Sequence, residues 1–349
     1  MPTLIKDHTM FLGVSRISSL FISSQTLSKT ITTTCLLAAA LAAQPSLAGT
    51  TPTEMVDALN NIFGRHAGVR AAHAKGLCVT GQFEPASNAS NFTSAAMFKK
   101  PALNGFGRFS IGGGNPGISD KSRTARGLAF RMGDGKENYD LVLISEPVSF
   151  AATPESFMSF LQARVPDPAT GKPNPEKIAA HNIQFPDGKA QAALLASHPA
   201  PASYSTTAYH STSAFGFTSK KGKNTWARLS LVPVAGTVYL DEATEASQPD
   251  QFLQADLQRR LAEKAIEFDL VAQHRTPGDS LQDSTMQWSG SKHTTLGRLK
   301  ITAQADAALC DAVTFLPTIL PAGVKASDDP ILQARAGAYA VSFGRRLAK

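Results

Sequence analysis

The chain has 349 residues, of which 42% are hydrophobic and 17% are charged, a composition that excludes a disordered or fibrous protein. Its formal net charge is +7, from 34 Lys and Arg against 27 Asp and Glu, which permits an anionic ligand. The densest basic cluster, residues 220–223, is typical of a solvated turn, so we expect no nucleic-acid partner.

The first 48 residues are predicted to be a secretory signal peptide. Residues 36–43 form an unbroken apolar run, Pro45 follows it, and Ser46-Leu47-Ala48 has small residues at both positions that a signal peptidase reads. The run is shorter than the about 20 residues that cross a bilayer. We therefore expect export to the periplasm, no membrane span, and a mature chain, residues 49–349, that forms one domain.

Two cysteines remain in the mature chain, Cys78 and Cys310. In an oxidising compartment they can pair, but two isolated cysteines more often stay as buried small apolar residues, and we favour that interpretation. No CxxC, CxxCH or HExxH motif occurs, which argues against covalent c-type haem and a zincin site. The pairing of the cysteines and the start codon, Met1 or Met10, stay open at this stage.

The mature chain begins with a predicted helix and continues mostly with strands. Thr51-Pro52-Thr53-Glu54 is a capping box with proline at the first helical position, and the helix should end near Gly64 or Gly68. Apolar or alternating segments separated by Gly, Asn and Asp then predict strands. The predicted strands are residues 76–83, 107–111, 127–132, 139–145, 213–219, 225–233, 265–274 and 295–305.

The remaining predicted helices lie between or after these strands. They cover residues 153–165, 189–197 and 247–264, and a last helix starts at residues 327–330 and runs toward the C-terminus. Residues 166–186 are rich in Pro and Asp and are expected to wrap the surface. Many spaced strands with few long helices predict one antiparallel β-barrel carrying peripheral helices.

Three stretches carry candidate chemistry. His73 lies between small residues just before a strand, and Arg108 and Ser110 share one face of the next strand. If that face is the barrel interior, the charge and the hydroxyl need a polar partner there. On the last helix, Arg335 and Tyr339 are four residues apart, where a guanidinium favours a phenolate, a hard anionic ligand suited to ferric iron. Taken singly, each also fits an ordinary core, surface or chance arrangement.

Together these stretches resemble the haem catalases, and more closely the smaller catalase-related peroxidases. The sequence Arg-Ala-Ala-His-Ala-Lys-Gly at residues 70–76 resembles the family's distal-histidine segment. Further similar segments follow in the family's order at residues 108–111, 126–132, 140–142, 320–327 and 335–339. The resemblance extends from about residue 55 to 347. It implies an α+β fold, a catalase-like antiparallel β-barrel with peripheral helices and a C-terminal helix that carries the proximal ligand.

The resemblance also implies a haem cofactor, haem b, and a role for each matched residue. Tyr339 is implied as the ligand of the haem iron, and Arg335 as the cation that holds it as phenolate. His73 is implied as the distal acid and base for peroxide, and Ser110 as its hydrogen-bond partner. The residues implied to hold the cofactor are Arg70, Arg108 and Arg346 at the two propionates, and Phe150 and Phe157 at the porphyrin, although both phenylalanines also fit an ordinary core.

Departures from the family pattern shift the expected activity. Ile144 and Ser145 stand where catalases have two asparagines, and Ala72 stands where they have a valine. An apolar side chain cannot donate a hydrogen bond to a second peroxide, so we expect weak or no catalase activity. The chain also lacks the long arm and terminal domain of full catalases, which favours a monomer or simple dimer. The family's NADPH signals are not recognisable around residues 209–210, so no NADPH is expected.

Three functional hypotheses follow. The first is a haem peroxidase that reduces hydrogen peroxide or organic hydroperoxides with a small organic electron donor and so protects against peroxide. The second is a relative that rearranges hydroperoxides, against which Ala72 argues because those enzymes have threonine there. The third is a non-catalytic haem-binding barrel, which needs neither His73 nor Arg335. The sequence favours the first, with peroxide and a small-molecule reductant as partners.

Overall fold

The computed structural model describes residues 49–348, so the predicted signal peptide, residues 1–48, lies outside the described residues. The segments with apolar or alternating patterns form ten strands that pair antiparallel throughout. The strands are β1 (Gly76–Pro85), β2 (Leu103–Ile111), β3 (Arg126–Gly133), β4 (Asn138–Ile144), β5 (Tyr209–His210), β6 (Phe215–Thr218), β7 (Asn224–Pro233), β8 (Ile266–His274), β9 (His293–Gln304) and β10 (Val324–Ala326).

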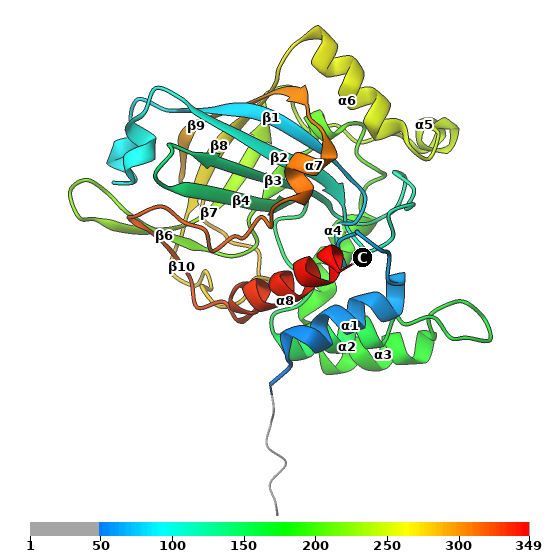
Figure 1. Ribbon diagram of the computed structural model, residues 1–349. Coiled ribbons are helices and arrows are strands. Elements are labelled where there is room, and N and C mark those ends of the chain that lie inside the picture. The colour runs from blue at the N-terminus through cyan, green and yellow to red at the C-terminus, as the bar shows by residue number, and fades with distance from the viewer. Residues whose placement is uncertain (1–48, 349) are drawn as a thin grey trace, which may run out of the picture. The chain divides into compact units, whose positions relative to one another are not determined.

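Eight of these strands close into a barrel (Figure 1). Their order is β7-β5-β4-β3-β2-β1-β9-β8, and β8 pairs back onto β7. Strands β6 and β10 extend the sheet beside β7. Closure pairs the strand edges of the ring with one another. The predicted α+β fold, an antiparallel β-barrel with peripheral helices, is confirmed.

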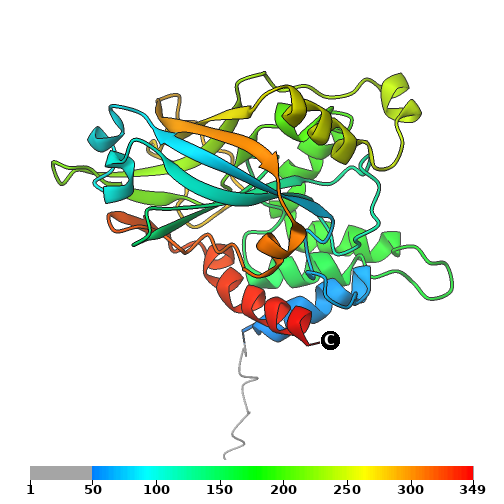
Figure 2. The same cartoon turned by 45° about the horizontal axis from the view of Figure 1, so that its top comes forward.

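Eight α-helices surround the barrel in the described part of the chain. Figures 1 and 2 show α1, α2, α3 and α8 gathered on one side of the barrel, with α5 and α6 on another. The helices are α1 (Pro52–Phe63), α2 (Pro154–Gln162), α3 (Pro175–Gln184), α4 (Lys189–Ala196), α5 (Glu242–Ser247), α6 (Phe252–Glu263), α7 (Ala307–Asp311) and α8 (Pro330–Leu347). No helix in this part of the chain is both long and apolar enough to cross a membrane.

Large aromatic side chains fill the barrel interior. Phe109 of β2 stacks on Tyr204 with ring centroids 5.0 Å apart and lies 6.4 Å from Phe268 of β8. Since successive side chains of a strand point to opposite faces, Arg108 and Ser110 lie on the outer face of β2. Of the two orientations that the sequence left open for these residues, the inward one is excluded, because the aromatic core occupies the barrel interior.

On this outer face, the register of β1–β4 aligns side chains into one continuous surface, which we call the floor. Ser110 of β2 lies opposite Gly127 of β3, which lies opposite Ile144 of β4. Two residues earlier on β2, Arg108 lies opposite Ala129 of β3. Side chains that are far apart in sequence therefore form parallel rows across the four strands, beneath the helices that cover this face.

Helix α8 packs closely on α1. An added Cβ on Gly337 would lie 2.6 Å from Cγ of Pro52, so the two helices approach at the contact of a glycine with a proline ring. Arg345 forms an ion pair with Asp57 at 2.7 Å across the same pair of helices. The first turn of α8 is capped by Asp329, whose carboxylate accepts hydrogen bonds from the backbone. These contacts fix the orientation of the helix that carries the C-terminal site residues.

Some short elements differ from the sequence-based expectation. Helix α3 occupies part of residues 166–186, the segment expected to wrap the surface, for which no helix is predicted from the sequence. Asn174 caps it and Pro175 is its first residue, a helix start that the surrounding Pro-rich sequence conceals. Strands β5 and β10 and helices α5 and α7 were also not predicted, because elements this short show no periodicity of their own.

Cys78 and Cys310 form a disulfide between the start of β1 and α7, across 232 positions of sequence. The interpretation that they remain free, buried apolar residues is therefore wrong. Both are buried, as expected, but β1 and the segment after β9 come together only through the barrel. Two isolated cysteines carry no sequence signal for that proximity.

Candidate active site

His73 and Ser110 meet above the floor of β1–β4. The Nδ1 atom of His73 lies 3.0 Å from Oγ of Ser110, as predicted for this pair. Gly127 makes the contact sterically feasible, because a Cβ there would lie 2.6 Å from the serine oxygen and 2.9 Å from the histidine nitrogen. The histidine ring is thus held over a glycine on the next strand.

The backbone at His73 is strained in a way that points to function. Its φ is 53°, and among the described residues it is the one non-glycine residue at positive φ. Arg108 stabilises this turn by donating to the carbonyls of His73 at 2.7 Å and Ala74 at 2.8 Å. A buried guanidinium therefore fixes the loop that presents the imidazole.

The electrostatic surroundings of His73 keep its ring neutral. Burial lowers the pKa of His73 to about 4, and the positive charges of Arg108 and Arg335 act in the same direction. At neutral pH the imidazole is consequently an unprotonated base. Its Nε2 atom has no hydrogen-bond partner within residues 49–348, which leaves this nitrogen available to a substrate.

Helix α8 supplies the opposite half of the site. Arg335 donates two hydrogen bonds to the hydroxyl oxygen of Tyr339, from Nε at 3.0 Å and from Nη2 at 2.6 Å. Both N–H donors belong to one guanidinium group, so a single positive charge lies against the phenol oxygen. The predicted Arg335–Tyr339 pair is thus present, with the guanidinium donating to the phenol oxygen.

The two halves belong to one site. Arg335 is close enough to His73 for its charge to lower the pKa of the imidazole. Ser342, one turn beyond Tyr339, accepts a hydrogen bond from the backbone N–H of Ala71 at 3.2 Å, two residues before the histidine. Helix α8 and the histidine loop are therefore tied together directly.

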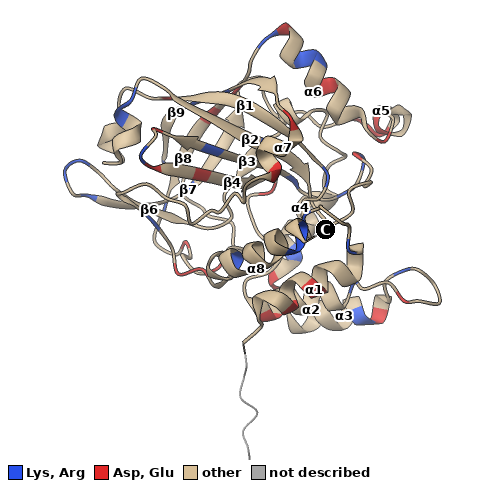
Figure 3. Ribbon diagram, in the orientation of Figure 1, with Lys and Arg blue, Asp and Glu red and all other residues tan. Residues whose placement is uncertain are grey.

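Three arginines gather at one end of this site. Arg70 forms an ion pair with Asp311, and Arg346 donates to the backbone carbonyl of Asp311 at 2.9 Å. Burial, followed by the charge of Arg70, lowers the pKa of Arg108 to about 10, and the same two causes lower that of Arg346 to about 10. Figure 3 shows basic residues at this C-terminal end of α8. The three predicted cofactor-binding arginines are thus neighbours, although each already contacts protein groups.

A cavity of about 150 Å³ opens beside these arginines. Its walls include Arg70, Arg108 and Asp311. The Nε atom of Arg346 is buried and has no hydrogen-bond partner in the described residues. Three guanidinium groups and the Asp311 carboxylate leave a local charge of +2, which needs anionic compensation.

Phe157 lies on α2 and Phe150 lies shortly before that helix, and their two rings are in contact. Their ring centroids are 5.4 Å apart, and Phe150 also lies 4.4 Å from Phe160. Phe157 packs against the apolar cluster of α1 and α8 that contains Ala338, the neighbour of Tyr339. Phe157 is therefore close to the site, whereas Phe150 contacts other aromatic residues of its own segment.

Ile144 and Ser145 occupy different environments. Ile144 ends β4 opposite Gly127, in the row that contains Ser110. The Ser145 hydroxyl instead accepts from the backbone N–H of Arg126 at 3.0 Å and donates to Glu146 at 3.1 Å. Of these two positions, only Ile144 therefore extends the floor of the site.

The sequence-based analysis did not identify Gly127, Ser342 or Asp311. Gly127 acts through strand register, and Asp311 meets Arg70 across 241 positions of sequence. Only a three-dimensional arrangement could have shown these roles, since no local motif marks them.

The residues present fit a haem group. Tyr339 with Arg335 is a suitable anionic ligand for ferric iron, and His73 provides a neutral base on the other half of the site. The net charge of +2 at the arginine cluster matches the two negative charges of the haem propionates. The buried, unpartnered Nε of Arg346 is a donor of the kind that a carboxylate satisfies.

Comparison with known proteins agrees with this geometry. The family model for catalase matches residues 52–349. A catalase-related peroxidase of Synechococcus elongatus is 33% identical over 302 residues, 85% of this chain and 89% of that protein. A catalase-related peroxidase of Mycolicibacterium paratuberculosis is 31% identical over 303 residues, 85% of this chain and 95% of that protein.

Solved catalase structures share the fold. A fungal catalase superposes with a TM-score of 0.72 at 22% identity, and catalase A from Saccharomyces cerevisiae with a TM-score of 0.71 at 22% identity. These matches cover 82% and 81% of this chain but 61% and 62% of the solved chains. This chain thus spans about three-fifths of their length. The chain belongs to the catalase family, and it is an oxidoreductase of the haem catalase and peroxidase class.

Proposed function

We propose that this protein is a haem-dependent peroxidase that reduces hydrogen peroxide or organic hydroperoxides at the expense of a small organic electron donor. The observation that carries the proposal is the Tyr339 hydroxyl, which receives hydrogen bonds of 3.0 and 2.6 Å from Arg335. The charge of Arg335 also acts on the neutral, partly buried His73. The two relatives named catalase-related peroxidase, similar over nearly their whole length, support it.

Haem, when bound, supplies an iron centre that exchanges electrons with the peroxide and with the donor. Tyr339 would hold the iron of haem b, and Arg335 would keep the phenol ionised. Arg70, Arg108 and Arg346 would compensate the propionates, because their cluster has an excess of two positive charges. Phe157, beside Ala338 of α8, would contact the flat face of the group.

His73 moves the proton in this proposal. In the tautomer proposed here, Nδ1, which lies 3.0 Å from the Ser110 hydroxyl oxygen, carries the proton and donates a hydrogen bond to that oxygen, which leaves the free lone pair on Nε2. Nε2 would take a proton from one oxygen of the bound peroxide. It would then give this proton to the other oxygen, which leaves as water or alcohol. Because the pKa of His73 is held near 4, the ring is ready to accept a proton at any pH well above that value.

Arg108 prepares the base for this transfer. Its two hydrogen bonds to the carbonyls of His73 and Ala74 hold the strained turn before any substrate binds. A preorganised base loses less entropy in the transition state than a mobile one. Arg108 is therefore a positioning residue for the proton transfer as well as a cation near the propionates.

Ile144 favours an organic donor over a second peroxide. Its side chain in the row of Ser110 and Gly127 has no hydrogen-bonding group. A second peroxide can be oxidised by two electrons only if it is oriented in the site where the first peroxide reacted. We therefore propose weak or no catalase activity, with the organic donor completing the cycle.

We also propose that the protein acts in the periplasm. The Cys78–Cys310 disulfide supports this location, because disulfides persist in oxidising compartments. There the enzyme would remove peroxide outside the cytoplasm.

A single assay tests the proposed function. Purified, haem-loaded protein is mixed with hydrogen peroxide and a colourless phenolic donor while an oxygen electrode records gas release. We expect donor oxidation with little oxygen. His73→Ala should bind haem normally and lose about 10²–10⁴-fold in donor oxidation, the usual contribution of a general acid and base. Vigorous oxygen release by the wild type, or unchanged donor oxidation by His73→Ala, would contradict the proposal.

A further inference from the structure

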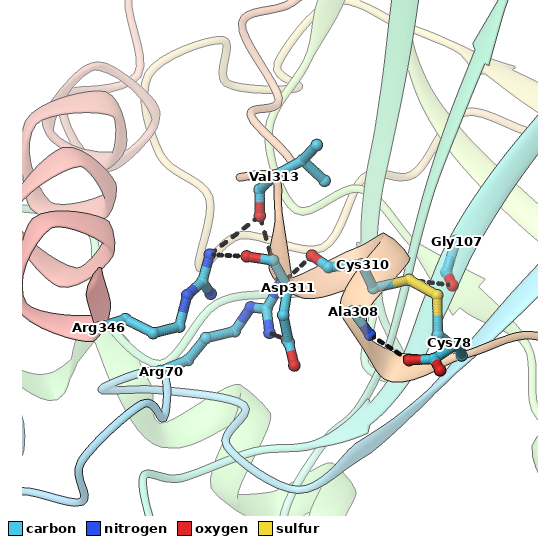
Figure 4. The surroundings of a disulfide bond; sticks show 9 residues. Arg70, Cys78, Gly107, Ala308, Cys310, Asp311, Val313 and Arg346 are labelled. Carbon is cyan, nitrogen blue, oxygen red and sulfur yellow. Dashed lines mark hydrogen bonds and ion pairs between the residues drawn. A yellow bond between two sulfur atoms is a disulfide. The ribbon is translucent and has the colours of Figure 1, made fainter. Parts of the chain in front are cut away.

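The connection from β9 to α8 crosses the outer face of β1–β4 and is fastened at two points. At one point Arg131 and Asp140 form a bidentate ion pair with both distances 2.7 Å, and Arg131 also donates to the carbonyl of Thr314 at 2.9 Å. At the other point, Cys310 of α7 is disulfide-bonded to Cys78 of β1 (Figure 4). The second fastening lies beside the arginine cluster.

The disulfide attaches α7 covalently to β1. This helix has five residues, and Cys310 is its one buried residue. Leu309, beside it, is 40% exposed. A helix of this length is not stable by itself, because its nucleation cost exceeds what a single turn of hydrogen bonds returns. The position of α7 therefore depends on its attachments to the rest of the protein. These are the covalent bond to β1, the packing of Cys310, the hydrogen bond of 2.9 Å from the N–H of Ala305 to the carbonyl of Cys78, and the contacts with Arg70 and Arg346.

The end of α7 holds two of the three arginines, as Figure 4 shows. Arg70 pairs with the Asp311 carboxylate and donates to the carbonyl of Cys310 at 2.6 Å. Arg346 donates to the carbonyls of Asp311 at 2.9 Å and Val313 at 3.1 Å. The acceptors of both guanidinium groups thus lie on Cys310, which forms the disulfide, or within three residues after it.

These acceptors oppose a repulsion between like charges. The charge of Arg70 lowers the pKa of Arg346 and of Arg108, while that of Asp311 acts in the opposite direction on both. If α7 moves away, the guanidinium groups lose these acceptors and repel each other toward solvent. The arrangement of these guanidinium groups, which suits the two propionate carboxylates of haem, therefore depends on the position of α7.

We propose that Cys78, Cys310 and Asp311 are positioning residues that form a clasp over the propionate end of the cofactor site, so that tight haem retention requires the disulfide. The inference rests on the proposed function, since it takes haem as the ligand. It implies that a reduced chain loads haem weakly and that stable holoprotein forms only after oxidation in the compartment where the protein acts.

The test measures the rate of haem release rather than activity. Holoprotein is mixed with excess apomyoglobin as haem acceptor, and the transfer is followed by absorbance. We expect Cys78→Ser/Cys310→Ser to release haem at least about tenfold faster than wild type, equivalent to about 1.4 kcal/mol. Asp269→Asn is the matched control, since it breaks an exposed ion pair with Arg298 on β8 and β9 and should release haem at the wild-type rate.

Three further measurements guard against a folding defect in the double variant. Wild-type holoprotein reduced with dithiothreitol should release haem faster, and reoxidation should restore the slow rate. Asp311→Asn, which keeps the disulfide, should also accelerate release, by a smaller factor. Hydrogen exchange at residues 305–313 should increase on reduction but not in Asp311→Asn.

The outcomes separate the clasp from the function. Equal release rates from oxidised and reduced wild type, with haem bound in both, would overturn the clasp and leave the peroxidase proposal intact. A wild-type chain that takes up no haem at all would overturn both.

Discussion

Reactive side chains in this site depend on residues that make room for them or fix their backbone. The Ser110–His73 pair exists because Gly127 has no side chain, and the strained turn at His73 persists because Arg108 holds two carbonyls. The chemistry of the site is therefore sensitive to substitutions that carry no chemistry themselves.

Gly127→Ala tests this dependence directly. The new Cβ would lie 2.6 Å from Oγ of Ser110 and 2.9 Å from Nδ1 of His73, so one of them must move. We expect kcat/KM for peroxide to fall at least about tenfold, about 1.4 kcal/mol of transition-state stabilisation, with haem content unchanged. Gly117→Ala is the control, because its Cβ meets nothing closer than 3.4 Å. Wild-type kinetics in Gly127→Ala would show that the ring position is not critical.

Ile144→Asn tests the balance between the two reactions of the family. An amide in this position adds hydrogen-bonding groups to the row of Ser110 and Gly127, where a second peroxide could be oriented. We expect oxygen release to rise relative to donor oxidation, measured in the same cuvette, and Ile144→Leu to behave as the wild type. If oxygen release does not rise, the role given to Ile144 is wrong.

Sequence reasoning reached the residues that lie in short motifs and missed those that act through space. His73, Ser110, Arg335 and Tyr339 stand in segments that resemble the catalase family, and the structure brings each pair within hydrogen-bond distance. Gly127 is defined only by strand register. A motif consists of residues that are close in sequence. Strand register and loop closure decide which residues that are distant in sequence come into contact.

At the level of elements, helix α8 connects every part of the site. Four of its residues recur at helical spacing: Arg335, Tyr339, Ser342 and Arg346. Arg335 contacts Tyr339, Ser342 contacts the histidine loop, and Arg346 contacts the end of α7 and the segment after it. The opposite side of the helix is fixed on α1 through Gly337. Shifting α8 would therefore disturb the phenol, the loop and the arginine cluster together.

Two glycines of α8 give a matched pair of predictions. Gly337→Ala places a Cβ 2.6 Å from the Pro52 ring, and we expect it to lower the free energy of unfolding by about 1–3 kcal/mol, as overpacking does. Gly344→Ala meets nothing within 4 Å and should raise that free energy by up to about 1 kcal/mol through helix propensity. Urea unfolding measures both. Equal effects of the two substitutions would contradict the close contact of α1 with α8.

The long elements were predictable and the short ones were not. Strands such as β7 and β8 carry alternation or apolar runs over nine or ten residues, which fixes their type from sequence. Strand β5 has two residues and α7 has five, so their conformation comes from the barrel and the disulfide that surround them. Closure of the barrel was expected as a class, but not the order of the strands.

At the scale of the whole molecule, buried neutral histidines link stability to pH. Burial lowers the pKa of His73 and of His210 to about 4, below the ordinary value of 6.5. Between these values the unfolded chain binds protons that the folded protein does not, so stability falls as pH decreases from about 6.5 to 4. The contribution is fully present above pH 6.5.

A histidine outside the catalytic pair tests this linkage. In His210→Asn one titrating group is absent, while the amide can keep the hydrogen bond to Ser230 that His210 Nδ1 makes at 2.8 Å. We expect the loss of unfolding free energy between pH 6.5 and 4.5 to shrink, by at most about 1.4 kcal/mol per pH unit for one proton. Urea unfolding at both pH values measures it. An unchanged pH dependence would mean that His210 is not buried in its neutral form.

The central claim is that Tyr339 holds haem iron opposite a distal base. The most direct measurement is the absorption spectrum of the purified, haem-reconstituted protein and of Tyr339→Phe, before and after one equivalent of hydrogen peroxide. The account predicts a high-spin ferric spectrum of the phenolate type that changes on addition of peroxide in the wild type, and a different spectrum or loss of haem in Tyr339→Phe. A wild-type protein that stays colourless, or a Tyr339→Phe spectrum identical to the wild type, would contradict it.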